Sequence, residues 1–248
     1  EKGRTEEQTS YMWLYTTGSD ALTPIVLYDY QPSRKGSCAQ NFLEGFRGLV
    51  QCDGYQGYNK LEDVILVCCL AHARRKFFEA VPAARRKRLK LLDINSDEAI
   101  EDINLPDEEE AKQLLPAEIG LLYCNKLFYL ERTLKDLNPE ERKQQRDVLE
   151  QPVWDQFWNW LDTLHPTGGS KLGKAVNYAQ NHHDTLMNYL LDGRCEISNN
   201  RAERKAKSYA IGRKAFLFHT SETGAGASAV MYSIVETAKA NNLNIFQY

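Results

Sequence analysis

The hydrophobic pattern of the chain changes its period near residue 70, and this change constrains the fold more than any other feature. Before it, short apolar and aromatic runs alternate with turn residues, as is typical of strands. These runs are residues 11–15, 24–30 and 64–68. The first two are separated by a short turn cluster and predict an antiparallel hairpin. The third is continuously apolar, which predicts a strand buried on both faces.

After residue 70, apolar residues recur at helical spacing almost to the C-terminus. Asn138 and Pro139 are typical of a helix start, with Asn as the cap and Pro in the first turn. Trp154, Phe157 and Trp158 are spaced for a buried stripe, and we interpret them as core rather than as a platform for nucleotide bases. The expected helices include residues 41–46, 70–80, 172–190, 200–210 and 224–240, and the inner face of the last is expected to be Ala227, Val230, Met231, Ile234, Val235 and Ala238.

Strands followed by a helix, a helical block and further helices indicate a mixed α/β fold. We expect one mixed sheet that is flanked by helices and interrupted by an all-helical insertion. Residues 1–83 would form the first part of this core, residues 84–192 the helical insertion, and residues 193–248 the C-terminal helices of the core. A chain of 248 residues suits one large domain with such an insertion.

Charge is distributed unevenly along the chain, although the formal net charge is only −3. Residues 70–90 contain eight Lys or Arg against one Glu, and residues 199–214 contain six against one Glu. Residues 93–118 reverse the balance, with ten acids against one Lys. Basic faces of this kind suit a polyanionic partner such as DNA. The alternative is that they are solvated helix faces.

The cysteines and the apolar runs indicate the compartment. Six cysteines show no framework spacing, and we interpret them as buried free thiols of a cytoplasmic protein. No apolar run approaches the roughly 18 residues that a membrane helix needs, and no signal peptide is visible at the start. Because the sequence starts with Glu1 and a polar stretch, we expect a fragment of a longer protein.

The first motif with candidate chemistry surrounds Asp53. This acid follows an apolar strand at the point where the chain turns over Gly54 and Gly57. A carboxylate at such a strand end could lie at a fixed position beside a cleft. The alternative is an ordinary Asp-Gly turn.

The second motif is the basic helix 70–80. His72, Arg75 and Lys76 share one helix face at spacings of three and four, and such a face could hold phosphates. A zinc site that combines His72 with the preceding pair Cys68 and Cys69 is an alternative. No second ligand pair lies at suitable spacing for it.

The third motif is centred on Glu203. Asn200 and Glu203 have the spacing of a capping box, which would explain both residues structurally. The functional alternative is that Glu203, one turn into the helix, points at a metal ion while Arg201 and Arg204 meet DNA.

In this order, the motifs resemble the bacterial transposases of the insertion sequence 66 family. The similarity covers nearly the whole chain and is weakest between residues 84 and 192. The matching segments are residues 25–34, Asp53-Gly54-Tyr55-x-Gly57-Tyr58, Ala71-His72-Ala73-Arg74-Arg75-Lys76-Phe77, Asn199-Asn200-x-Ala202-Glu203-Arg204, Ile211-Gly212-Arg213-Lys214 and residues 232–241.

The resemblance implies a ribonuclease H-like core with an Asp-Asp-Glu (DDE) triad that cleaves and transfers DNA strands. Asp53 would be the second acid and Glu203 the third, with the helical insertion between them. Both would be metal ligands for two divalent ions, Mg²⁺ or Mn²⁺. The candidate DNA contacts are His72, Arg74, Arg75, Lys76, Arg201, Arg204, Arg213 and Lys214.

The chain departs from the family in one respect. The family places its first acid on a strand before the segment that matches residues 11–15, and residues 1–10 look like the polar linker after that strand. We therefore expect the N-terminal catalytic strand to be absent here, with Asp29 as the one substitute considered. The metal site of this chain alone would then be incomplete and could be empty, and the isolated chain would be inactive.

Transposon ends and target DNA are the expected partners, in the bacterial cytoplasm, and the sequence leaves open whether copies form a homo-oligomer. Two alternatives to a transposase follow from the incomplete triad and from the fold. The first is a DNA-binding or assembly module without chemistry of its own. The second is a metal-dependent nuclease of the same fold, which would hydrolyse DNA without joining it.

Overall fold

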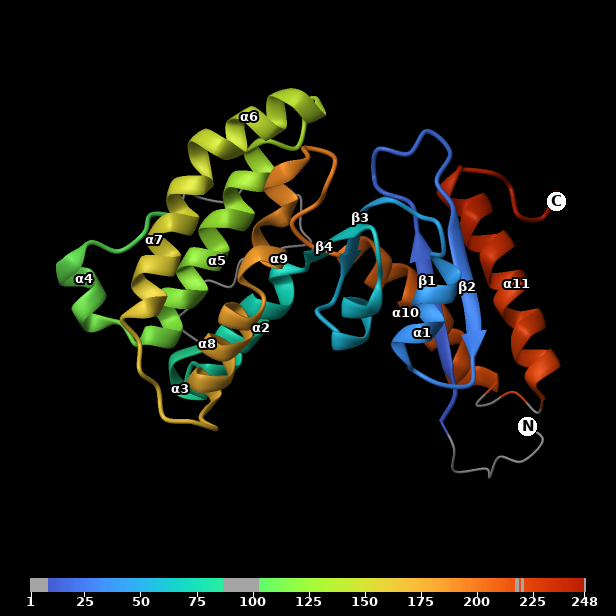
Figure 1. Ribbon diagram of the computed structural model, residues 1–248, viewed down its shortest axis with the longest axis horizontal. Coiled ribbons are helices and arrows are strands. Elements are labelled where there is room, and N and C mark those ends of the chain that lie inside the picture. The colour runs from blue at the N-terminus through green and yellow to red at the C-terminus, as the bar shows by residue number, and fades with distance from the viewer. Residues whose placement is uncertain (1–8, 87–102, 217–218, 220, 248) are drawn as a thin grey trace. The chain divides into compact units, whose positions relative to one another are not determined.

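A computed structural model describes residues 9–86, 103–216, 219 and 221–247 (Figure 1). The chain divides into two compact units. Unit 1 comprises Glu1–Gly48, Tyr55–Val64 and Asn199–Tyr248, and unit 2 comprises Leu49–Gly54 and Ile65–Ser198. Most of the expected polar stretch 1–10 and parts of the basic and acidic runs, residues 87–90 and 93–102, lie outside the described residues. The division into a core and a helical insertion stays a prediction.

Unit 1 is built on the expected antiparallel hairpin of β1 (Tyr11–Thr16) and β2 (Val26–Gln31). Trp13 of β1 is buried against Cys38 and Ala39, which lie in helix α1 (Gly36–Phe42). The short helix therefore lies at 36–42 rather than at the expected 41–46, because it is placed by the small residues that pack under Trp13. The 3₁₀ helix η1 (Gln56–Lys60) also belongs to this unit.

Two long helices complete unit 1, α10 (Asn200–Phe216) and α11 (Glu222–Ala240). Helix α10 contacts β1 and continues past the predicted end at residue 210. Helix α11 runs along β2 (Figure 1). The Ser233 hydroxyl accepts a hydrogen bond from the Tyr28 amide at 2.8 Å, and the Thr237 hydroxyl accepts one from the Val26 amide at 2.9 Å.

This contact with β2 corrects the predicted inner face of α11. The buried residues of the helix are Ala225, Ala229, Ser233, Glu236 and Ala238, whereas Val230 and Met231 are each 59% exposed. The helix turns its hydroxyl groups inward because the outer edge of β2 carries backbone groups that need partners. Of the predicted inner face, Ala238 is buried as expected, whereas Ala227, Val230, Met231 and Ile234 are exposed.

Unit 2 combines a small sheet with a helical block. The sheet consists of β3 (Gly48–Cys52) and β4 (Val64–Cys68). Burial of β4 is confined to Val67 and Cys68, and Ile65 is 44% exposed, so the expectation of burial on both faces was wrong. The helices are α2 (Leu70–Ala80), α3 (Ala83–Arg86), α4 (Glu108–Gln113), α5 (Pro116–Thr133), α6 (Pro139–Leu149), α7 (Gln151–Asp162), α8 (Lys171–Asn181), α9 (His183–Met187) and the 3₁₀ helix η2 (Asn188–Leu191).

The core of unit 2 forms where α2, α5, α7 and α8 meet (Figure 1). Phe77 of α2 is fully buried and stacks edge-on against Phe157 of α7. Helix α5 approaches this pair at Gly120, where a Cβ atom would lie 2.5 Å from the Phe77 ring. The aromatic stripe is thus core, as predicted, and Asn138 caps α6 by accepting from the Glu141 amide. The stripe 172–190 is broken at His182 into α8 and α9.

The mixture of helices with small sheets agrees with the predicted α/β class. Within the described residues, however, the strands form two separate two-stranded sheets and not the single mixed sheet that was expected. The ribonuclease H-like arrangement therefore stays a prediction.

Candidate functional site

Asp53 lies directly after β3 and begins a turn that only glycine fits at its second position. Gly54 has a φ of +76°, and a Cβ atom there would lie 2.8 Å from the Tyr178 hydroxyl and 3.3 Å from the Cys68 sulfur. The Tyr178 hydroxyl also donates to the Asp53 carbonyl at 3.4 Å. Both the backbone conformation and the packed side chains therefore fix the half-buried Asp53 at the end of its strand.

The carboxyl ends of β3 and β4 lie side by side at this point. The Cys69 amide donates to the Cys52 carbonyl at 3.1 Å, as expected of a parallel pair. Helix α2 begins one residue later, and its Leu70 amide donates to the Ile197 carbonyl at 3.0 Å. The Gln51 side chain donates to the neighbouring Glu196 carbonyl. The strand that leads to Asp53 is therefore bonded to the segment that precedes α10.

A cluster of thiols and a histidine lies against the Asp53 turn and was not predicted from the sequence. The Cys68 sulfur lies 3.5 Å from Nδ1 of His182, a residue 114 positions away. A hydrogen bond from the Cys52 thiol and the contact with His182 lower the pKa of Cys68 to about 5. Cys68 thus has His182 as a neighbour, a histidine that was not considered for the zinc site. Segments so distant in sequence carry no spacing signal that could reveal the pair.

The basic residues of α2 are used in different ways. The Arg74 Nε donates to the amide oxygen of Asn125 in α5 at 2.6 Å. The Lys76 ammonium lies 4.9 Å from the centre of the Tyr178 ring, and His72 is half-buried. Arg75 is exposed. Among these four predicted DNA contacts, Arg75 has the side chain most available to a phosphate.

Helix α10 carries Glu203 in its first turn. The Glu203 amide donates to the Asn199 carbonyl at 3.1 Å, so Asn199 occupies the cap position and Asn200 is already helical. A capping box needs its glutamate at the third helical position, whereas these bounds make Glu203 the fourth. Whether Asn200 and Glu203 form a capping box stays a prediction. On the same helix Arg204, Arg213 and Lys214 are exposed, and Arg201 is half-buried.

The two candidate acids belong to different units, Asp53 to unit 2 and Glu203 to unit 1. Their convergence on one site stays a prediction. Asp29 lies on β2 in unit 1, where its carboxylate accepts a hydrogen bond from the Gln31 side chain at 2.8 Å.

The carboxylates of Asp53 and Glu203 are ligands of the kind that a magnesium ion binds, but two of them are too few. Carboxylate oxygens are the ligands that Mg²⁺ prefers. Among the described residues, however, no three or more His, Cys, Asp or Glu are grouped so that they could hold a metal ion. A complete metal site would need a further donor in addition to Asp53 and Glu203.

None of the helices in the described ranges combines the length and the apolar character that crossing a lipid bilayer requires.

Comparison with known proteins assigns the sequence to a family. Residues 1–227 match the family described as "Transposase IS66 family". Three similar proteins of Sinorhizobium fredii (strain NBRC 101917 / NGR234) are named "Uncharacterized protein y4hP", "y4qI" and "y4jD". They are 28%, 26% and 29% identical over 95%, 96% and 91% of this chain. The chain spans only 42%, 42% and 41% of their lengths. No solved structure matches the chain.

Proposed function

Because the chain belongs to the IS66 transposase family, we propose that it is the catalytic region of a DDE-type enzyme for metal-dependent DNA cleavage and strand transfer. Its substrates would be the DNA of transposon ends and target DNA. The observation that carries this proposal is the construction of the Asp53 turn. A carboxylate is held at the carboxyl end of a paired strand, next to the start of a basic helix.

In this proposal Asp53 and Glu203 are metal ligands of one site. When bound, two divalent ions would activate a water or a 3′-hydroxyl and stabilise the leaving oxygen. Gly54 and Tyr178 fix the backbone at Asp53, and Glu203 lies in the first turn of α10. The remaining acid would lie on a strand outside the described residues, with Asp29 of β2 as the alternative.

The order of elements supports a ribonuclease H-like core. A β1–β2 hairpin is followed by β3, which ends in an acid, and then by β4 and helices. In this proposal a further strand carries the first acid. The helical block of unit 2 would then be the insertion between the second and third acids.

DNA would be bound mainly through its phosphates. Arg75 on α2, together with Arg201, Arg204, Arg213 and Lys214 on α10, offers positive charge on the helices that carry or follow the acids. Contacts of this kind position the duplex without reading its sequence. Recognition of the transposon end would therefore depend on other parts of the full-length protein.

The test is a cleavage and joining assay with the full-length transposase that contains this chain. A labelled transposon end, target DNA and Mg²⁺ should give a cleaved 3′ end and a joined product. Asp53→Asn and Glu203→Gln should each reduce both steps by more than about a hundredfold, because loss of a direct metal ligand should exceed the 10–100-fold typical of its outer partners. Cleavage without joining would indicate a nuclease, and DNA binding without either step would indicate an assembly module.

A further inference from the structure

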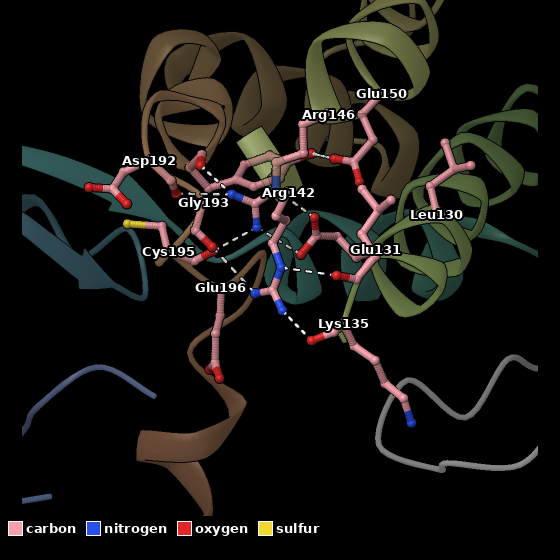
Figure 2. A network of polar contacts seen from close by, with 12 residues as sticks. Leu130, Glu131, Lys135, Arg142, Arg146, Glu150, Asp192, Gly193, Cys195 and Glu196 are labelled. Atoms are coloured by element: carbon pink, nitrogen blue, oxygen red, sulfur yellow. Dashed lines mark hydrogen bonds and ion pairs between the residues drawn. The ribbon is translucent and has the colours of Figure 1, made fainter. Parts of the chain in front are cut away.

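The helical block of unit 2 contains a fully buried arginine that bonds to α5 and to backbone carbonyls in the segment between η2 and α10. Arg146 of α6 donates from Nε and one terminal nitrogen to the Glu131 carboxylate, at 2.6 and 2.9 Å. Its terminal nitrogens also donate to the carbonyls of Tyr189, Asp192 and Cys195, at 2.8, 3.0 and 2.7 Å. Figure 2 shows the guanidinium of Arg146 between Glu131 and the turn that contains Asp192 and Cys195.

A second arginine of α6 reaches the same turn. Arg142 donates to the Gly193 carbonyl at 3.4 Å and to the carbonyls of Leu134 and Lys135 at the end of α5 (Figure 2). On its other side, the segment continues to Glu196 and Ile197, whose carbonyls accept from Gln51 and from the Leu70 amide. Residues 192–197 are thus bonded both to the helical block and to the elements that carry Asp53.

Stability alone does not explain this arrangement. A buried charge is costly to desolvate, and an apolar cluster of similar volume is often at least as stable as a buried ion pair. Apolar side chains, however, could not hold three backbone carbonyls in fixed positions. A guanidinium can, because it has five donors in a rigid planar fork. The network therefore determines the path of the 192–197 segment.

We propose that Arg146, assisted by Arg142, is a positioning residue for the third catalytic acid. The segment that it holds passes through Ser198 and Asn199 directly into α10, whose first turn contains Glu203. The helical block would thereby hold in place the segment of unit 2 from which the chain continues into α10. This inference rests on the proposed role of Glu203 as a metal ligand.

The decisive variant is Arg146→Lys in the full-length transposase. Lysine retains a cation beside Glu131 but cannot donate to that carboxylate and three carbonyls at once. We expect faster amide hydrogen exchange in residues 192–203 without metal, a higher Mg²⁺ concentration for half-maximal cleavage, and a cleavage rate reduced about 10–100-fold, as for other outer partners of metal ligands. DNA affinity should not change.

The matched control is Arg85→Lys. Arg85 also bonds a buried glutamate, Glu118, at 2.9 Å and a backbone carbonyl, that of Gln113. Within the part of the chain that the structure describes, Arg85 makes no hydrogen bond to residues 192–197. Its replacement should therefore leave their exchange and the Mg²⁺ requirement as in the wild type. If Arg146→Lys does not fold, Arg142→Gln, which lacks the bond to Gly193, takes its place. It should show smaller changes in the same direction in amide exchange, Mg²⁺ requirement and cleavage rate.

Two results separate this inference from the proposed function. If Glu203→Gln retains cleavage, Glu203 is not the acid and the proposed function fails with it. If Glu203→Gln abolishes cleavage but the folded arginine variants match the control in exchange and Mg²⁺ requirement, the positioning role alone is refuted.

Discussion

At the scale of single residues, neighbouring arginines of α2 are expected to serve different purposes. Arg75 is exposed, whereas Arg74 donates to Asn125, which is buried. We predict that Arg75→Gln weakens DNA binding across all sequences. The slope of log K against the logarithm of the salt concentration should become shallower by about one, and the free energy of unfolding should not change. Arg74→Gln should instead lower the free energy of unfolding by about 1–3 kcal/mol, because it leaves a buried amide with a poorer partner.

Fluorescence anisotropy at several salt concentrations and urea unfolding measure these two effects. Unchanged DNA affinity in both Arg75→Gln and Arg204→Gln would support the alternative that these basic faces are merely solvated.

The buried side chain of Glu150 should make the stability of the protein depend on pH. Glu150 lies between α6 and α7, is fully buried, and accepts a hydrogen bond from the Tyr189 hydroxyl. Burial, and then the nearby carboxylate of Glu131, raise the pKa of Glu150 well above its ordinary value. A raised pKa in the folded state means that its favourable contribution is present below the unfolded pKa of about 4.3 and is lost as the pH rises through the folded pKa.

We therefore predict that Glu150→Gln, which accepts the same hydrogen bond without a charge, is more stable than the wild type at pH 8. The gain should be on the order of 1–3 kcal/mol and should vanish near pH 4. Urea unfolding across this pH range measures it. Glu131→Gln is the contrasting variant and should destabilise at neutral pH, because it removes the charge that faces Arg146. Parallel pH profiles for Glu150→Gln and the wild type would contradict the prediction.

At the scale of elements, α11 protects the edge of β2 with hydroxyl groups. The Thr237 hydroxyl accepts from the Val26 amide and donates to the Val26 carbonyl at 3.0 Å. Thr237→Val keeps the shape of the side chain but leaves both backbone groups without this partner, so we predict a loss of about 1–3 kcal/mol in the free energy of unfolding. Thr223→Val, at an exposed position of the same helix, should cost much less. Equal losses in urea unfolding would show that the edge does not depend on this contact.

Most helices and strands could be predicted from the sequence, but some of their contacts could not. Strand signals predicted the β1–β2 hairpin, and helical spacing predicted most helices of unit 2, because both are local patterns. The inner face of α11 was wrong because Ser233 and Thr237 satisfy a strand edge, a demand that apolar spacing does not reveal. The Cys68–His182 contact and the Arg146 network join segments far apart in the chain, so no local pattern could predict them.

At the scale of the whole molecule, the two candidate acids belong to different units and lie far apart in the sequence. Asp53 and Glu203 would have to converge for two-metal chemistry, since the two ions lie about 3.5–4 Å apart. The position of Asp53 is determined by unit 2 and that of Glu203 by a helix of unit 1. Activity should therefore also depend on the donor that completes this pair, which is the first acid.

This reasoning leads to a prediction about the length of the protein that is tested. Two carboxylates should bind Mg²⁺ weakly, because this ion is strongly hydrated and requires near-octahedral oxygen ligands. The 248-residue chain alone should therefore bind DNA but not cut it. A protein of the length of its relatives should cleave transposon ends with Mg²⁺, and Asp53→Asn in that protein should abolish cleavage while DNA affinity is retained. Cleavage by the 248-residue chain that is lost on Asp29→Asn would instead identify Asp29 of β2 as the first acid.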